Sequence, residues 1–337
     1  MQAVKGTSMS IALSRSIMIA ALICLGVSAV MAEETETPAA AGRPVKIAAI
    51  AIGYGGEWQP KMELATKHLE AAGASGVDIA CLPEEFAGLN AEPQDGPTTR
   101  AIGQLAKKHH MFVVCPIREQ ADDGKQYNTA VLLDRSGEIV GYYRKVFVFW
   151  DENLHAGTEG VKTFDLDFGR VALLTCFDAN FDEVWQQAER QGAEIVLWPS
   201  AYGGGMPLNG YAMIHNYNVV AVGHGDIIDI FGRAAKDVES PLDQQYIATV
   251  DLDLAIVHTD FNGAKVERLL ADHGDEIKRL PDLGQSEGWY VLQATKPGVR
   301  VRDLLREYDL ETLHEYRHRS RDQINELRAA EKRIVGS

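Results

Sequence analysis

The sequence predicts an α/β protein built as a sandwich of mixed β-sheets, with a helical tail at its C-terminal end. Apolar runs typical of buried strands alternate along the chain with segments whose apolar residues recur at helical spacing. Two of the runs, 128–134 and 138–144, are separated by the short segment RSG, a turn suited to a β-hairpin. Hairpins among helix-linked strands indicate mixed sheets. Hydrophobic residues make up 46% of the 337 residues, which is enough for a sizeable core.

Each element is expected from a local pattern. The strands are apolar runs bounded by turn residues, and the helices carry apolar residues three or four positions apart. The expected strands are 45–53, 77–82, 111–117, 128–134, 138–144, 170–175, 194–200, 218–225, 227–233, 246–254 and 288–295, and the expected helices are 58–72, 99–109, 181–191 and 209–216. Together these elements predict one main domain over residues 45–300. The charged segment 301–337 is expected to be a helical extension whose apolar face packs on the body or on a partner subunit; that face holds Leu313, Tyr316, Ile324 and Leu327.

Residues 1–32 are expected to be a signal peptide. Lys5 and Arg15 precede an apolar run that ends in small residues, a pattern typical of cleavage after Ala32. The polar segment 33–44 is then expected to be a tether. The apolar run is near the lower limit for spanning a bilayer, so cleavage is favoured over retention as a membrane anchor. The mature protein is expected to be exported, to the periplasm or the cell exterior, without stable membrane insertion.

The net charge and the cysteine content argue against some classes of partner and of fold. The formal net charge of −15 argues against nucleic acid or an anionic membrane surface as the partner. Three cysteines follow the N-terminal segment, an odd number at wide spacing that does not fit a disulfide framework. Cys81 and Cys115 lie within apolar runs and are expected to be buried. Cys176 instead stands where an apolar run ends and polar sequence begins.

Three reactive side chains stand just beyond expected strands. Glu84 follows 77–82, Lys145 follows 138–144, and Cys176 follows the apolar run that begins at residue 170. Reactive groups gather beyond the carboxyl ends of strands in open α/β folds, so we expect these three to meet at one sheet edge. A thiol can act as a nucleophile, a carboxylate can take its proton, and an ammonium can stabilise an oxyanion. Each residue alone has an ordinary structural explanation, and only the ordered set indicates chemistry.

The segments LPEEF, GYYRKVF and LLTCFDANF resemble, in the same order, the three signature segments of the nitrilase superfamily of carbon–nitrogen hydrolases. The resemblance covers about residues 45–295. It implies a four-layer α-β-β-α sandwich, with Glu84 as general base, Lys145 as oxyanion stabiliser and Cys176 as nucleophile. It also implies a second glutamate after the lysine, for which Glu152 is the match. Subunits are expected to pair through helices next to the nucleophile, into a homodimer or a larger homo-oligomer.

The reaction that this resemblance implies is hydrolysis of a non-peptide carbon–nitrogen bond through a cysteine thioester, with no metal or organic cofactor. The sequence Cys-Phe-Asp at 176–178 resembles the amidase and carbamoylase branches, so a small amide or N-carbamoyl amine is favoured over a nitrile. The N–H of Phe177 is expected to help hold the oxyanion. Trp150, Tyr202 and His224 are candidates for lining the substrate site.

Two hypotheses of other classes are weighed against this one. The chain could be a catalytically silent binding homologue, although all three reactive side chains are retained. The segment HEYRH also matches the zinc pattern H-E-x-x-H, in which His314 and His318 bind the metal and Glu315 is the base of a metallopeptidase. Its surroundings are strongly charged, and the later acidic residues Glu326 and Glu331 lie on the same expected helix. A solvated helix is therefore the favoured interpretation.

Overall fold

The computed structural model describes residues 40–281 and 283–335. The predicted signal peptide and most of the predicted tether lie outside these residues, so both stay predictions. Within the described part of the chain, no helix combines the length and the hydropathy that a bilayer crossing requires.

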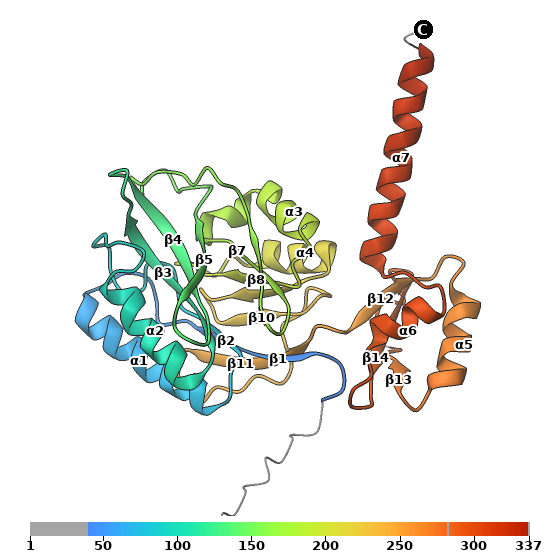
Figure 1. The fold of residues 1–337 in the computed structure, drawn as a ribbon, viewed down its shortest axis with the longest axis horizontal. Coiled ribbons are helices and arrows are strands. Elements are labelled where there is room, and N and C mark those ends of the chain that lie inside the picture. Colours follow the sequence, from blue (N-terminus) through green and yellow to red (C-terminus); the bar gives the residue numbers. More distant parts are fainter. Residues whose placement is uncertain (1–39, 282, 336–337) are drawn as a thin grey trace, which may run out of the picture. The chain divides into compact units, whose positions relative to one another are not determined.

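Two mixed sheets form the main body (Figure 1). Across the first sheet the order is β11 (Gln245–Asp251), β1 (Pro44–Ile50), β2 (Ile79–Cys81), β3 (Phe112–Gln120), β4 (Gln126–Leu133) and β5 (Ile139–Arg144). Across the second it is β10 (Asp226–Ile228), β9 (Asn218–Ala221), β8 (Ile195–Trp198), β7 (Arg170–Leu173) and β6 (Thr163–Asp165). In each sheet three parallel strands (β1, β2 and β3; β7, β8 and β9) are flanked by antiparallel neighbours. The carboxyl ends of β2 and β7 therefore present loops that can carry reactive groups.

Helices cover the outer faces of the two sheets (Figure 1). The first sheet carries α1 (Trp58–Ala74) and α2 (Pro97–His109), and the second carries α3 (Asp182–Arg190) and α4 (Met206–His215). Strand β1 shows the alternation that this layering requires: Val45 and Ile47 join the core between the sheets, whereas Ala48 and Ile50 join the core beneath α1 and α2. The predicted four-layer α-β-β-α sandwich is confirmed.

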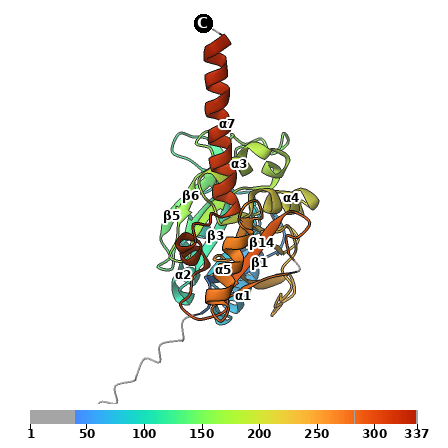
Figure 2. The same ribbon diagram turned by 90° about the vertical axis from the view of Figure 1, so that its right-hand side faces the viewer.

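A third sheet follows the sandwich in sequence. Figure 2 brings it to the front, with α5 and β14 side by side. It contains β12 (Ala255–His258), β14 (Trp289–Ala294) and β13 (Ile277–Arg279), and it packs with α5 (Gly263–His273) and α6 (Val301–Glu307) around an apolar cluster of its own. The sequence reading missed β12, α5 and β13. β12 and β13 are too short to show a recognisable hydrophobic pattern. Helix α5 buries only Val266 and Leu269.

Other differences are local. The strand β6 was not expected, and the expected strand 227–233 ends at residue 228. There the Asp229 side chain accepts N–H bonds from Phe231 and Arg233 and forms a turn. Cys81 and Cys115 are fully buried, as expected, and burial raises the pKa of both thiols.

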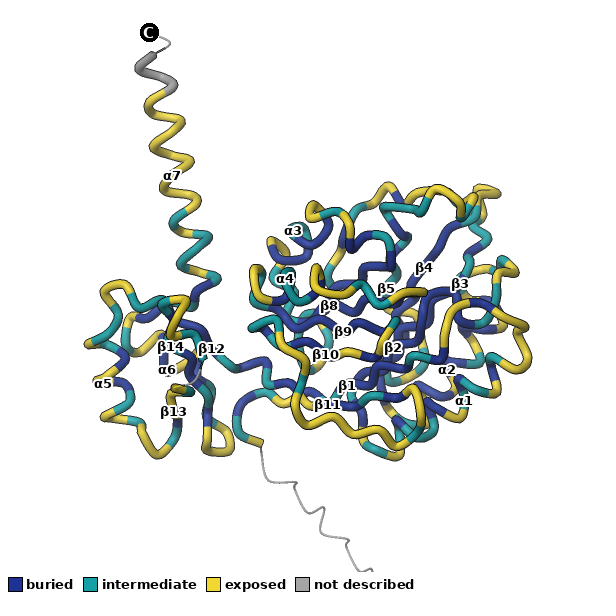
Figure 3. Tube along the Cα trace, turned by 180° about the vertical axis from the view of Figure 1, so that it is seen from behind, coloured by how far each residue is buried: buried dark blue, intermediate teal, exposed yellow. Residues whose placement is uncertain are grey.

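The predicted helical extension consists of two helices. α6 is followed by a break at 308–312 and then by α7 (Leu313–Val335). Leu313 is buried and Tyr316 packs beside it. Ile324 and Leu327 are exposed, and Figure 3 shows the same change from buried to exposed along the helix. Only the beginning of the predicted apolar face is therefore covered within this chain.

Candidate active site

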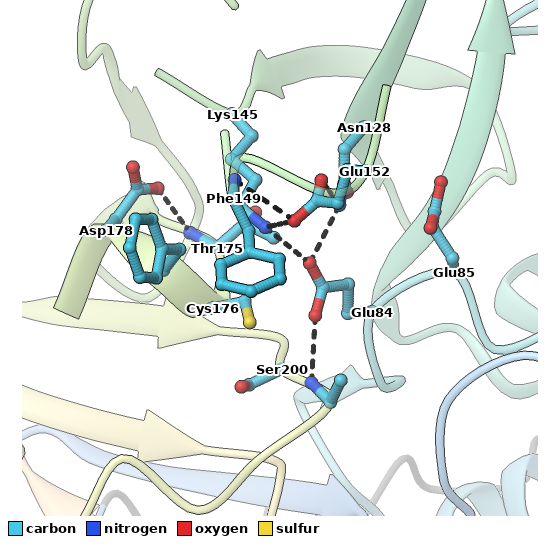
Figure 4. A network of polar contacts seen from close by, with 12 residues as sticks. Glu84, Glu85, Asn128, Lys145, Phe149, Glu152, Thr175, Cys176, Asp178 and Ser200 are labelled. Carbon is cyan, nitrogen blue, oxygen red and sulfur yellow. Dashed lines mark hydrogen bonds and ion pairs between the residues drawn. The ribbon is translucent and has the colours of Figure 1, made fainter. Parts of the chain in front are cut away.

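Three predicted side chains, those of Glu84, Lys145 and Glu152, form one polar network, and the Cys176 thiol lies beside it (Figure 4). Glu84 follows β2, Lys145 follows β5, Cys176 follows β7, and Glu152 lies in the loop after the lysine. Lys145 Nζ is 2.8 Å from Glu84 Oε1 and also pairs with Glu152 Oε1. The lysine and Glu84 side chains are 0% and 2% exposed. The structure thus brings together groups from three distant segments of the chain.

The motif LPEEF contains two adjacent glutamates, and the structure separates them. Glu84 faces the lysine, whereas Glu85 accepts hydrogen bonds from Arg118 Nε at 2.8 Å and from the Tyr54 hydroxyl at 3.1 Å. Figure 4 shows the two carboxylates pointing in different directions. Of the two, only Glu84 is placed to reach the thiol of Cys176.

Two further donors hold the Glu84 carboxylate. Asn128 Nδ2, on β4, donates to Oε1 at 2.7 Å, and the Ala201 N–H donates to Oε2 at 2.9 Å. Asn128 is buried, and its backbone carbonyl accepts the backbone N–H of Lys145 at 2.9 Å. Both carboxylate oxygens are therefore held, so the group has one orientation, which a general base requires.

Cys176 occupies a sharp turn between β7 and the 3₁₀ helix η1 (Cys176–Asn180). Its φ is 44°, in the left-handed region, a conformation that costs a non-glycine residue about 1–3 kcal/mol. Its N–H donates to Pro199 O at 3.0 Å, and its carbonyl accepts the Trp198 Nε1–H at 3.1 Å. These bonds hold the turn in place. The residue is 9% exposed, so it is buried without being sealed from solvent.

The protonation states follow from this environment. Burial and the neighbouring Glu84 carboxylate raise the pKa of the Cys176 thiol to about 12, and Lys145 opposes this only in part. The resting group is therefore a thiol at neutral pH and needs a base when it attacks. Burial lowers the pKa of Lys145, but the negative charges of Glu84 and Glu152 outweigh it, so the pKa lies above its ordinary value. The lysine is therefore a permanent ammonium.

Asp178 connects the nucleophile turn with the lysine segment. Its buried carboxylate accepts the Thr175 N–H at 2.8 Å, the Phe147 N–H at 3.0 Å and the Tyr143 hydroxyl at 2.9 Å. The first donor precedes the nucleophile, and the other two flank Lys145. Burial raises the pKa of Asp178 to about 6 although these hydrogen bonds oppose the rise. Asp178 is thus a positioning residue for both segments.

Phe177 and Trp150 lie around one aromatic ring. The Phe149 ring is 5.3 Å from the ring of Phe177 and 5.4 Å from that of Trp150, measured between centroids. Phe177 directly follows the nucleophile in η1, whereas Trp150 is 82% exposed. The indole is therefore placed at the solvent side of this aromatic group.

Tyr202 and His224 lie near each other, beside the loop after β8. The Tyr202 N–H donates to Ser200 Oγ at 3.0 Å, and burial, followed by the charge of Cys176, raises the pKa of the tyrosine. The exposed His224 ring packs so closely on Gly203 that an added Cβ would lie 2.2 Å from it. Tyr202 thus lies within electrostatic range of Cys176. The His224 ring contacts the loop that carries the tyrosine.

Glu315, the base in the metallopeptidase interpretation of HEYRH, forms hydrogen bonds with Thr312 at the start of α7. Glu315 Oε2 accepts hydrogen bonds from the Thr312 N–H at 2.7 Å and its hydroxyl at 2.8 Å, and the Glu315 N–H bonds back to that hydroxyl at 3.3 Å. This reciprocal pair is a capping box at the start of α7. The carboxylate that the motif needs as a base is therefore engaged in capping the helix.

Sequence reasoning missed Asn128 and assigned no role to the carboxylate of Asp178. Asn128 is a polar residue within an apolar run, a weak signal that also fits an ordinary strand end. Asp178 lies two residues after the nucleophile, but its donors come partly from 31 and 35 residues earlier. The two roles depend on contacts between separate strands and loops, which local patterns do not reveal.

Comparison with known proteins identifies the family of the chain. The family model described as "Carbon-nitrogen hydrolase" matches residues 46–258. A beta-ureidopropionase from Arabidopsis thaliana is 35% identical over 153 residues, which are 40% of this chain and 38% of that protein. The chain spans about half the length of the next curated relatives.

Two solved structures share the fold. Saccharomyces cerevisiae Nit3, a member of branch 10 of the nitrilase superfamily, has a TM-score of 0.56 and 19% identity over 73% of this chain and 97% of its own. A mutant of the amidase from Nesterenkonia sp. AN1 has a TM-score of 0.54 and 17% identity over 64% of this chain and 93% of its own. With the family model covering more than half of the chain, the chain belongs to the carbon–nitrogen hydrolase family, within the nitrilase superfamily.

Proposed function

We propose that the protein hydrolyses a non-peptide carbon–nitrogen bond of a small amide or N-carbamoyl amine, with Cys176 as the nucleophile. The observation that carries the proposal is the Lys145–Glu84 pair, with Nζ and Oε1 2.8 Å apart, beside a strained and slightly exposed cysteine. Membership of the family supports it, because the family is named for this reaction.

The first half-reaction acylates the enzyme. Glu84 takes the Cys176 proton while the sulfur forms a bond to the carbonyl carbon. The tetrahedral intermediate then collapses, the carbon–nitrogen bond breaks, and the leaving ammonia or amine takes the proton back from Glu84. A thioester remains on the sulfur. The high pKa of the thiol makes this proton transfer necessary, because almost no thiolate exists beforehand.

The second half-reaction uses the same base. Glu84 takes a proton from water, the resulting hydroxide attacks the thioester carbon, and the carbon–sulfur bond breaks. Glu84 returns the proton to the sulfur, and the acid is released. The fixed orientation of the carboxylate suits both directions of transfer.

Lys145 and the Phe177 N–H are the proposed oxyanion donors. Two donor positions of the ammonium are taken by Glu84 and Glu152, which leaves a third for the substrate oxygen. The Cys176 N–H is already bonded to Pro199 O, so the next N–H along the turn is the candidate. Glu152 is proposed to hold the ammonium in position between the two carboxylates.

The substrate class rests on sequence and on similar proteins. Cys-Phe-Asp resembles the amidase and carbamoylase branches, and the curated relatives include a beta-ureidopropionase. The Nesterenkonia amidase of the same fold shows covalent addition of an acetamide moiety at its active-site cysteine. Trp150, Tyr202 and His224 are proposed to contact the substrate at the solvent side. Nitrile hydrolysis is the alternative that a substrate panel must test.

The test is a panel of small amides, N-carbamoyl amines and nitriles followed by ammonia release. Brief reaction with an active substrate should give a mass increase on Cys176 equal to the acyl group less the hydrogen that it replaces. Cys176→Ala should abolish turnover and the adduct without changing the circular dichroism spectrum, whereas Cys115→Ala should keep both. Wild-type activity in Cys176→Ala would overturn the proposal.

Export and assembly are separate proposals. We propose that the chain is cleaved after Ala32, and the intact mass of the protein from its native host would show whether it begins at Glu33. We also propose a homodimer through α3 and α4, supported by the exposed apolar side chains of Met206, Met213 and Ile214. Light scattering of wild type and Ile214→Asp would test the dimer.

A further inference from the structure

The HEYRH segment, which has no part in the proposed hydrolysis, lies next to a third possible metal ligand in helix α3 of the sandwich. His314 and His318 lie on one face of α7, four residues apart, with ring centroids separated by 4.3 Å. Glu189, in the last turn of α3, places Oε1 at 2.6 Å from His318 Nε2 and 3.3 Å from His314 Nε2. The third donor that the sequence could not supply thus comes from 129 residues before His318.

We propose that Glu189, His314 and His318 bind a divalent transition-metal ion, zinc by preference, which fastens the beginning of α7 to α3. One donor atom from each residue lies within 4.8 Å of the other two, so small side-chain rotations would bring all three onto one ion. Two imidazoles and one carboxylate are a donor set that zinc uses in proteins, with water in the fourth position.

The surroundings fit an ion that joins two helices and keeps its fourth position open to solvent. The Glu189 side chain is 11% exposed, and those of His314 and His318 are 41% and 31% exposed, so a carboxylate lies at the base and solvent reaches the imidazoles. His314 also lines a cavity of about 540 Å³, which offers a path for the ion. Glu315 is engaged in the helix cap, so it does not stand beside the ion as a base.

One nearby positive charge opposes metal binding. Arg317 lies close enough for the Glu189 charge to act on it, but its Nη1 donates to Ile214 O at 2.6 Å and to Asn216 Oδ1 at 2.8 Å. The guanidinium is therefore held by other acceptors and does not occupy the carboxylate. The competing explanation of the cluster is a histidine–glutamate hydrogen bond without metal, and the two explanations differ in metal stoichiometry.

The experiment uses the untagged full chain, freed of metal by a chelator and then dialysed. Titration with Zn²⁺ by calorimetry and with Co²⁺ by visible absorption should show one equivalent, with a Kd in the micromolar range or below. Glu189→Gln and His318→Ala should each weaken binding at least 10-fold. Cys176→Ala should leave it unchanged and so exclude the thiol as the ligand.

The matched control is His273→Ala. His273 Nδ1 lies 2.8 Å from Glu276 Oε2, Glu276 also pairs with Lys296, and none of the three belongs to the three-donor group. Its removal should leave the stoichiometry at one. Zn²⁺ should also slow tryptic cleavage within α7 in wild type and not in Glu189→Gln. Absence of saturable binding, or binding that survives both Glu189→Gln and His318→Ala, would overturn the site.

Discussion

Lys145 Nζ lies 2.8 Å from Glu84 Oε1 in a place where neither side chain is more than 2% exposed. The same ammonium pairs with Glu152, so one buried cation serves two carboxylates. This arrangement joins the proposed base to the proposed oxyanion donor. Removing the Lys145 charge should therefore cost more stability than removing either carboxylate charge, because it leaves two buried carboxylates without a cation.

Lys145→Met should destabilise the fold more than Glu84→Gln. The methionine variant leaves Glu84 and Glu152 unpaired, which should lower the free energy of unfolding by about 3–5 kcal/mol. Glu84→Gln keeps the Lys145–Glu152 pair and an amide oxygen for Asn128, so about 1–2 kcal/mol is expected. Urea unfolding followed by circular dichroism measures both.

The control for this pair is Lys162→Met. Lys162 pairs with Glu159 at the surface, where both side chains are at least 40% exposed, so a loss below about 1 kcal/mol is expected. If Glu84→Gln proved the more damaging of the two buried substitutions, the charge distribution described for the network would be incorrect.

Cys176 should react as a protonated thiol. Its pKa of about 12 predicts that alkylation by iodoacetamide, followed by mass spectrometry at this residue, becomes faster from pH 7 to pH 10 without reaching a plateau. Cys81 and Cys115 are fully buried and should stay unmodified in the folded protein, which gives an internal control. A plateau with a midpoint below pH 8 would instead indicate a resting thiolate.

Glu152→Gln should lower kcat by on the order of 100-fold, because Lys145 would lose one of its two anionic partners and its fixed position. KM should change little if the ammonium acts mainly on the oxyanion. Glu159→Gln, seven residues later and exposed, is the matched control and should keep the wild-type rate. Equal rates in the two variants would remove Glu152 from the proposed machinery.

Asp178→Asn should lower kcat at least 10-fold, since an amide cannot accept all three hydrogen bonds that hold the nucleophile turn to the lysine segment. A second readout is pH dependence. The folded-state pKa of about 6 lies above the ordinary value of 3.8, so the stability linked to this group is present below pH 3.8 and is lost as the pH rises through 6.

The difference in unfolding free energy between wild type and Asp178→Asn should therefore change between pH 4 and pH 6.5. Wild type should lose up to about 3 kcal/mol relative to the variant over this range. Parallel curves for the two proteins would show that Asp178 has the same proton affinity folded and unfolded, and would contradict the burial argument.

Much of this protein could be predicted from local sequence. The apolar run that contains Val45, Ile47 and Ile50 predicted a buried strand, and three such runs placed Glu84, Lys145 and Cys176 just beyond strand ends. Among the missed elements, β13 has only three residues, and α5 buries only Val266 and Leu269. These elements are stabilised by packing around the apolar cluster of the third sheet, and that packing involves several segments at once.

The chemical groups, their order along the chain and the layered fold class follow from short segments, because residue type and periodicity are local properties. Tertiary structure decided that Glu84 and not Glu85 faces the lysine, that Asn128 and Asp178 hold the site, and that Glu189 approaches His314 and His318. The physical reason is that hydrogen bonds and ion pairs act over a few ångströms in space. Partners more than 30 residues apart therefore meet only after the sheets and helices have packed.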